Sequence, residues 1–184
     1  MRLLVSIVSF MALLLGTPAM AWAQGAPEPK GGPVFTDFGQ VYAVDPDVPV
    51  PKDAVFKLFF EISEGAAPGT INTKVNSAGR FINMHVAAGV PAENIHIALV
   101  VHGTAGMDLL KDAAYRARNG GKPNASAAAV SQLLAHGVDI YLCGQSAAGR
   151  NYPGKDLIPG VKVSLSAMTM YALLQQQGYT FNPS

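Results

Sequence analysis

The chain has 184 residues, with 13 Lys and Arg against 12 Asp and Glu, and a single Cys. This length suits one domain with a sizeable core. The near balance of charge argues against nucleic acid or an acidic membrane surface as partner, because both need a basic patch that neutralises phosphate charge.

The first residues have the order of a secretory signal peptide. Arg2 precedes an apolar run from Leu3 to Leu15, and Ala21-Trp22-Ala23 supplies the small-residue cleavage pattern. The run is shorter than the about 20 apolar residues of a spanning helix. We therefore expect residues 1–23 to be removed near Ala23/Gln24, and the mature chain to work without membrane insertion in the periplasm or, as second choice, as a secreted protein.

Residues 24–53 are rich in Pro and Gly and show no sustained period. Frequent prolines remove backbone donors and fix φ, so this segment is predicted to be an extended arm. The arm contains Phe35, Phe38, Val41 and Tyr42, which would allow part of it to pack on the domain or on a neighbouring subunit.

Residues 54–184 alternate between strand and helix patterns, which predicts an α/β domain. Apolar runs of strand length are found at 55–62, 95–101, 138–142 and 161–165, with a short final strand at 179–181. Helical spacing follows from Ile71 to Val86, along Met107, Leu110, Ala114 and Ala117, from Asn124 as N-cap to His136, and from Ser166 as cap to Gln177. Residues 145–160 are expected to form a loop or short helix. Such alternation implies parallel βαβ units in a three-layer α/β/α sandwich.

Polar or reactive residues follow two of the predicted strands. One strand ends in His102-Gly103-Thr104, and the other ends in Cys143-Gly144-Gln145-Ser146. Ligands of open parallel sheets bind outside the carboxyl ends of the strands. If the two strands are neighbours, His102 and Cys143 face a common crevice, where the imidazole would favour the thiolate.

The lone Cys143 has three readings in an oxidising compartment: a buried inert thiol, a thiol paired between chains, or a working thiol. A cysteine at the start of a helix gains from unpaired backbone N–H groups, which lower its pKa and favour the thiolate that attacks sulfur. Gly144 keeps the loop open, and Arg150 would supply positive charge to an anionic sulfur species. The alternative is that Cys143 only packs at the end of its strand.

Other motifs give little support for a cofactor or a metal. One cysteine with scattered histidines lacks zinc-ligand spacing. The sequence contains no Walker loop, no GxGxxG and no GxSxG. We therefore expect neither a metal nor a cofactor.

Three segments resemble the DsrE/DsrF-like proteins: NIHIALVVHG (94–103), GVDIYLCGQS (137–146) and GVKVSLSAMTMYALLQQQGYTFNP (160–183). The resemblance covers residues 54–182 and implies a five-stranded parallel sheet, assembly into homo-oligomers (trimers or hexamers), and sulfur chemistry on the strand-end cysteine. In the relay members a cysteine at the position of Cys143 accepts a persulfide sulfur from a donor protein and passes it to an acceptor.

The leading hypothesis is therefore an exported sulfur carrier of the sulfurtransferase kind that uses Cys143. Its rival is a non-catalytic small-ligand or protein-binding subunit of an assembly, in which Cys143 is structural. A thiol-based redox sensor is a third hypothesis.

Overall fold

A computed structural model describes residues 27–183, so the predicted signal peptide lies outside the described residues. Five strands form one sheet in the order β4-β3-β2-β1-β5, and every pair is parallel. The strands are β1 (Phe56–Ile62), β2 (Ile95–Val101), β3 (Asp139–Cys143), β4 (Lys162–Ser164) and β5 (Thr180–Asn182). The predicted five-stranded parallel sheet is confirmed.

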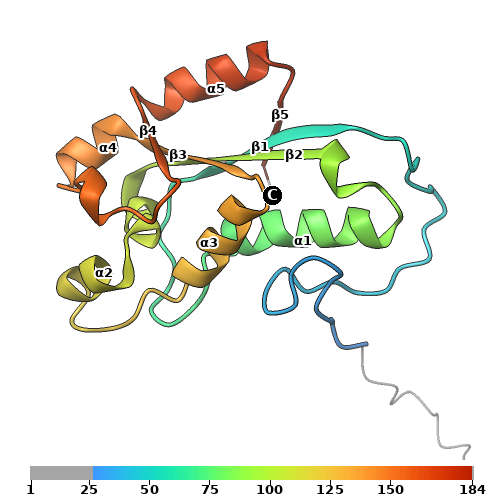
Figure 1. Cartoon of the computed structure of the whole chain (residues 1–184), viewed down its shortest axis with the longest axis horizontal. Coiled ribbons are helices and arrows are strands. Elements are labelled where there is room, and N and C mark those ends of the chain that lie inside the picture. Colours follow the sequence, from blue (N-terminus) through green and yellow to red (C-terminus); the bar gives the residue numbers. More distant parts are fainter. Residues whose placement is uncertain (1–26, 184) are drawn as a thin grey trace, which may run out of the picture.

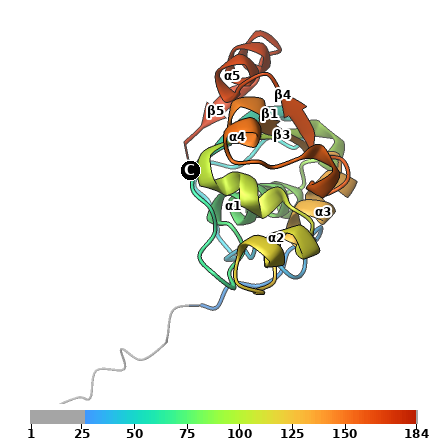
Figure 2. The same cartoon turned by 90° about the vertical axis from the view of Figure 1, so that its left-hand side faces the viewer.

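The helices cover the two faces of this sheet unequally (Figures 1 and 2). One face carries α1 (Thr73–Ala87), α2 (Asp112–Arg118) and α3 (Ala127–Ala135), whereas the other carries α5 (Ala167–Gln176). The short helix α4 (Gly144–Gly149) continues directly from the carboxyl end of β3. The predicted three-layer α/β/α fold is confirmed, with a second outer layer that consists mainly of α5.

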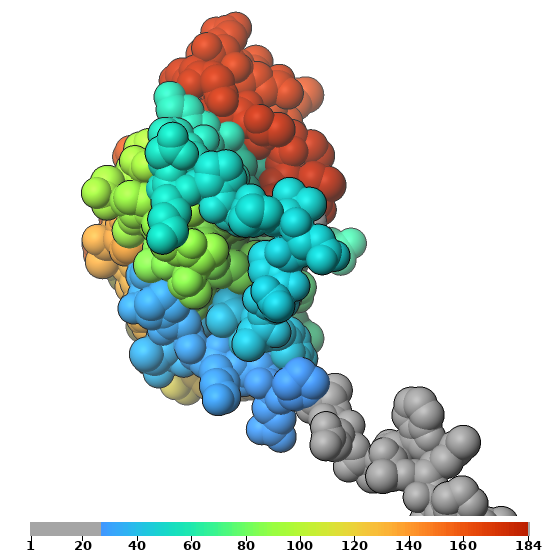
Figure 3. Space-filling view, turned by 90° about the vertical axis from the view of Figure 1, so that its right-hand side faces the viewer, coloured from blue at the N-terminus to red at the C-terminus, as the bar shows by residue number. Residues whose placement is uncertain are grey.

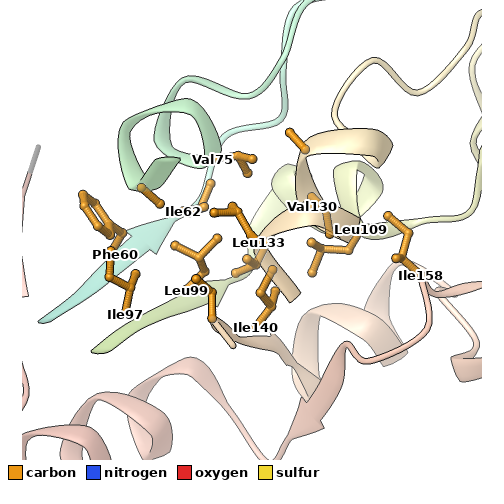
Figure 4. Close-up of a cluster of buried hydrophobic side chains, with 14 of the residues drawn as sticks. Phe60, Ile62, Val75, Ile97, Leu99, Leu109, Val130, Leu133, Ile140 and Ile158 are labelled. Carbon is orange, nitrogen blue, oxygen red and sulfur yellow. The ribbon is translucent and has the colours of Figure 1, made fainter. Parts of the chain in front are cut away.

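Alternation of side chains along the strands divides the core into two clusters. In β2, for example, Leu99 points to the larger cluster under α1 and α3, and its neighbour Val100 points to the smaller cluster under α5. Figure 4 shows the larger cluster, in which Leu99 and Ile140 of the sheet lie beside Leu133 of α3. The smaller cluster comprises Phe59, Ala98, Val100, Cys143, Ala167, Met170 and Leu174. The thiol of Cys143 therefore belongs to the thinly covered face of the sheet.

The segment from Gly103 to Arg118 departs from its sequence pattern. Instead of one helix that includes Met107 and Leu110, it forms a 3₁₀ segment η2 (Gly103–Leu109), a break, and then α2. Leu110 is fully buried and pairs with Leu157 in an isolated antiparallel bridge. The Lys111 N–H donates to the carbonyl of Asp156 (2.8 Å). These long-range hydrogen bonds replace the helical ones that the spacing predicted.

The start of α3 also differs from the prediction. The N-cap position is Ser126, two residues after the predicted Asn124. Asn124 instead holds the approach to the helix: its Oδ1 accepts from the Ser126 N–H (3.0 Å), and its Nδ2 donates to the carbonyls of Asp108 and Leu110. Remaining short elements are the 3₁₀ turns Ala92–Asn94 and Gly154–Asp156, the latter within the segment predicted as loop or short helix.

The N-terminal arm folds back on the domain rather than extending away from it. The backbones of Lys30 and Val41 pair in an antiparallel bridge, and the intervening Phe35 and Phe38 are each 3% exposed. The arm lies below α1 in Figure 1 and at the end opposite α5 in Figure 3. Of the alternatives left open by the sequence, packing on the domain itself is what the structure shows. Among residues 27–183, no helix has the length and apolar content needed to cross a bilayer.

Candidate functional site

The carboxyl edge of the sheet brings the two predicted polar strand ends together. β2 and β3 are neighbours, with Val101 opposite Leu142, so His102 and Cys143 follow directly at the same edge. Both line a pocket of about 580 Å³ on the α5 side of the sheet. The lining consists of Phe59, Glu61, His102, Cys143, Gln145, Ser146, Ser166, Ala167, Met168, Tyr171, Gln175 and Phe181.

Cys143 is the last residue of β3 and the N-cap of α4. It is 6% exposed, and the pocket is where it meets solvent. Burial raises the pKa of its thiol, but hydrogen bonds from the Ser146 and Ala167 N–H groups, the Ser146 hydroxyl and the Gln145 N–H lower it, and the net pKa is below the ordinary value. The thiolate is therefore favoured by fixed dipoles from two segments of chain.

His102 interacts with Glu61 rather than with the thiol. Its Nε2 lies 2.6 Å from Glu61 Oε1, and both side chains are about one-third exposed on the pocket side of the sheet. The role predicted for the imidazole, favouring the Cys143 thiolate, is instead filled by backbone N–H groups. The His102–Glu61 pair is a separate hydrogen-bonded pair in the same pocket.

The predicted glycines shape the turns around the thiol. A Cβ on Gly144 would lie 2.4 Å from the Ser164 carbonyl oxygen, which is too close for any other residue. Gly103 has φ +58° and its N–H donates to Ser146 Oγ (3.0 Å), so the end of β2 is tied to α4. Gln145 lines the pocket, and its Nε2 donates to the Leu165 carbonyl (3.4 Å).

The structure does not bring Arg150 to this pocket. Residues 144–149 form a short helix, one of the two forms predicted for this segment, and Arg150 follows the far end of that helix, exposed to solvent. There its positive charge acts on Tyr152, which lies outside the pocket lining. The positive charge predicted beside the sulfur is therefore absent from the pocket.

Three aromatic side chains that sequence reasoning missed form one wall of the pocket. Phe59 stacks on Tyr171 with ring centroids 5.5 Å apart, and the ring centroids of Phe59 and Phe181 are 5.4 Å apart. Burial, with the negative charges of Glu61 and Cys143, raises the pKa of Tyr171 to about 12, so its hydroxyl stays protonated. Only the β1–β5 pairing and the crossing of α5 over the sheet bring these residues to Cys143.

Glu61 was also missed, although the sequence held a signal for it. It is the lone carboxylate within the apolar strand β1, and alternation places it on the same face as Phe59. The register of β1 on β2, with Ile62 opposite Val101, then brings Glu61 beside His102. Within residues 27–183 no group of three or more His, Cys, Asp or Glu side chains is arranged to hold a metal ion.

Comparison with known proteins places the chain in a family. No curated protein matches its sequence. Among solved structures it is similar to MTH1491 from Methanobacterium thermoautotrophicum, described as a protein of unknown function: 19% identity, 70% of this chain and 99% of that chain covered, TM-score 0.52. It is also similar to the YchN protein from E. coli: 18% identity, 69% and 100% covered, TM-score 0.49. The DsrE/DsrF-like family model matches residues 58–183. The chain therefore belongs to the DsrE/DsrF-like family, as the resemblance predicted.

Proposed function

We propose that this protein is a sulfur carrier of the sulfurtransferase kind, in which Cys143 accepts a sulfane sulfur as a persulfide. The observation that carries the proposal is the position of a thiol with lowered pKa in the lining of a pocket of about 580 Å³. Such a thiol ionises more readily than an ordinary cysteine and can be reached by a small molecule or by the end of a partner side chain. Membership of the DsrE/DsrF-like family is consistent with sulfur-relay chemistry.

The proposed step is an exchange between sulfur atoms without net oxidation. The Cys143 thiolate attacks the outer sulfur of a persulfide donor, R–S–SH, and forms a new S–S bond while the donor S–S bond breaks. The products are Cys143–S–SH and the thiolate R–S⁻. His102, held by Glu61 at 2.6 Å in the same pocket, is placed to protonate that leaving sulfur. The step uses no cofactor, and delivery to an acceptor thiol is its reverse.

The test is to treat the protein with a sulfane donor and to measure its mass by mass spectrometry. We expect one added sulfur on Cys143 and none on a Cys143→Ser variant. His102→Gln should slow uptake and change its pH dependence, whereas iodoacetamide should still alkylate Cys143. A thiol that reacts with iodoacetamide but never gains sulfur from any donor would overturn the proposal.

The rival function is a non-catalytic small-ligand or protein-binding subunit of an assembly, in which Cys143 is structural. It is favoured by the burial of Cys143, which packs with Ala167 and Met170 in the smaller cluster. Under this rival, the native thiol is inert to iodoacetamide, and Cys143→Ser keeps both stability and ligand binding. A rate of alkylation comparable to that of a free cysteine peptide excludes it.

We also propose that the chain forms a homo-oligomer, a trimer or a hexamer, and exchanges sulfur with donor and acceptor proteins. Support comes from exposed apolar side chains outside the pocket lining, at the β4 edge of the sheet and on α5: Val163, Leu165 and Leu173 are 53%, 73% and 42% exposed. Apolar side chains gathered on one surface mark interaction sites. Light scattering after gel filtration should give a mass above that of one chain, and a purely monomeric profile would exclude self-association.

The place of action is proposed from the sequence pattern of residues 1–23. Export to the periplasm, with secretion as second choice, predicts a mature chain that begins at or near Gln24. N-terminal sequencing of the protein recovered from a periplasmic fraction checks this. Recovery of the uncleaved chain from the cytoplasm would contradict it.

A further inference from the structure

The pocket around Cys143 has no permanent positive charge, and its basic side chain, His102, is paired with the carboxylate of Glu61. Its lining contains no Lys or Arg, and Arg150 faces Tyr152 elsewhere. The one Asp or Glu side chain of the lining is Glu61, whose partner is His102. Sites that bind inorganic anions normally supply Arg, Lys or free backbone N–H groups. The N–H groups of Gln145, Ser146 and Ala167 lower the pKa of the Cys143 thiol, and the lining offers no Lys or Arg to a second anion.

The size and surface of the pocket fit an organic group. At about 580 Å³ the pocket falls within the range of sites that hold whole small molecules, roughly 300–1,000 Å³, and is far larger than an inorganic sulfur anion needs. One wall is formed by Tyr171 and Phe181, which pack on the buried ring of Phe59. Ala167 and Met168 of α5 extend this apolar surface. Such a wall binds alkyl or aromatic groups by burial of apolar area.

We propose that the pocket selects a sulfane sulfur carried on an uncharged, apolar organic group, and discriminates against inorganic or anionic sulfur donors. This inference rests on the proposed function and specifies its donor. The organic group R lies on the accessible rings of Tyr171 and Phe181, which pack on the buried Phe59, while its outer sulfur meets Cys143. The thiolate attacks that sulfur, the S–S bond of the donor breaks, and R–S⁻ leaves as R–SH after protonation, so atoms and electrons balance.

Charge selection is tested separately from sulfur transfer by two alkylating agents of nearly equal size. Iodoacetamide is neutral and iodoacetate is an anion, and both react by the same displacement at the thiolate. The ratio of their rates at Cys143, divided by the same ratio for N-acetylcysteine amide, isolates the effect of the pocket. We expect iodoacetamide to be favoured about tenfold, because the carboxylate of Glu61 repels an anion and no Lys or Arg of the lining attracts it. A normalised ratio of one or below overturns the proposal.

A lysine at the rim supplies the missing charge and provides a matched pair of variants. Met168 lines the pocket and is 77% exposed, so Met168→Lys should fold normally. It should lower the normalised ratio severalfold toward one. Met84→Lys is the control, because Met84 is a 43% exposed methionine on α1, on the opposite face of the sheet. An equal change in both variants would contradict a local effect of the pocket.

Sulfur donors then test directly whether the pocket selects an uncharged, apolar organic group. The measurement is the rate at which Cys143 gains the mass of one sulfur atom. The probes are benzyl persulfide released from a neutral precursor, glutathione persulfide and thiosulfate. We expect benzyl persulfide to load Cys143 fastest and thiosulfate slowest. Loading by thiosulfate at an equal or higher rate overturns this inference and leaves the carrier function standing. Loading by none of the three overturns the carrier function itself.

Discussion

Asn83 of α1 fastens the N-terminal arm to the domain, and its removal should loosen the arm selectively. The side chain is fully buried. Its Oδ1 accepts from the Val34 and Phe35 N–H groups (3.1 and 3.0 Å), and its Nδ2 donates to the carbonyls of Phe35 and Gly39 (both 2.9 Å). The substitution Asn83→Ala leaves these four backbone groups without their partner.

The expected loss of stability follows from these contacts. Each hydrogen bond contributes about 0.5–1.5 kcal/mol net, so four give roughly 2–6 kcal/mol. Two effects reduce the loss: alanine is the better helix former by about 0.5 kcal/mol, and the arm can detach so that water satisfies its backbone. Detachment exposes Phe35 and Phe38 to water, which costs a free energy of about 1.5–3 kcal/mol for each side chain. We therefore expect the free energy of unfolding to fall by about 2–4 kcal/mol.

Urea denaturation measures this change, and amide hydrogen exchange locates it. Protection of the Val34 and Phe35 amides should be lost in Asn83→Ala, while protection in the central strand β2 falls only with global stability. Asn76→Ala is the control on the same helix, because Asn76 accepts one bond from the arm, the Gly39 N–H at 2.8 Å. It should lose about 1 kcal/mol. Stability within 0.5 kcal/mol of the parent, with both amides protected, would refute the reasoning.

Three further predictions concern Asp108, Ser146 and Gly144. Burial raises the pKa of Asp108 above 3.8 despite hydrogen bonds from Asn72 and the Ala66 N–H. The stability it contributes is present below 3.8 and is lost as pH rises through its folded pKa, so the stability difference between the parent and Asp108→Asn should fall with rising pH in urea titrations. Ser146→Ala removes a hydrogen bond to the thiol and should raise the pKa of Cys143, which slows alkylation at neutral pH. Gly144→Ala should lower stability by about 1–3 kcal/mol in the same urea assay, because its Cβ would lie 2.4 Å from a carbonyl oxygen.

Each of these predictions has its own control. For Asp108 the contradicting result is a stability difference between the parent and Asp108→Asn that rises with pH. Such a rise would show that the folded protein stabilises the ionised carboxyl. Ser131→Ala, on the solvent side of α3, should leave the alkylation rate unchanged. Gly149→Ala lies in the same helix as Gly144 with no atom within 4 Å of the added Cβ, and it should not lower stability. Equal losses in the two glycine variants would contradict the steric reason.

The order of the elements was determined by sequence patterns alone. Short apolar runs such as 95–101 can be buried on both faces only within a sheet that helices cover, and the alternation of strands with helices then fixes parallel crossovers. For the same reason Cys143 and His102 could be placed at one edge before the structure was known. These inferences succeed because they depend on periodicity and chain order, which are local properties.

The composition of the site was decided by tertiary structure. Glu61, Tyr171 and Phe181 reach Cys143 only through strand register and the path of α5 across the sheet, neither of which periodicity encodes. The predicted place of Arg150 beside the sulfur was wrong, because residues 144–149 form a helix and Arg150 follows the end of that helix away from Cys143. The position of the N-terminal arm was likewise determined by long-range contacts. These are the hydrogen bonds of Asn83, which join groups 44 to 49 residues apart. Contacts at such separation depend on the whole packed domain, whereas the elements themselves depend on their neighbours in the chain.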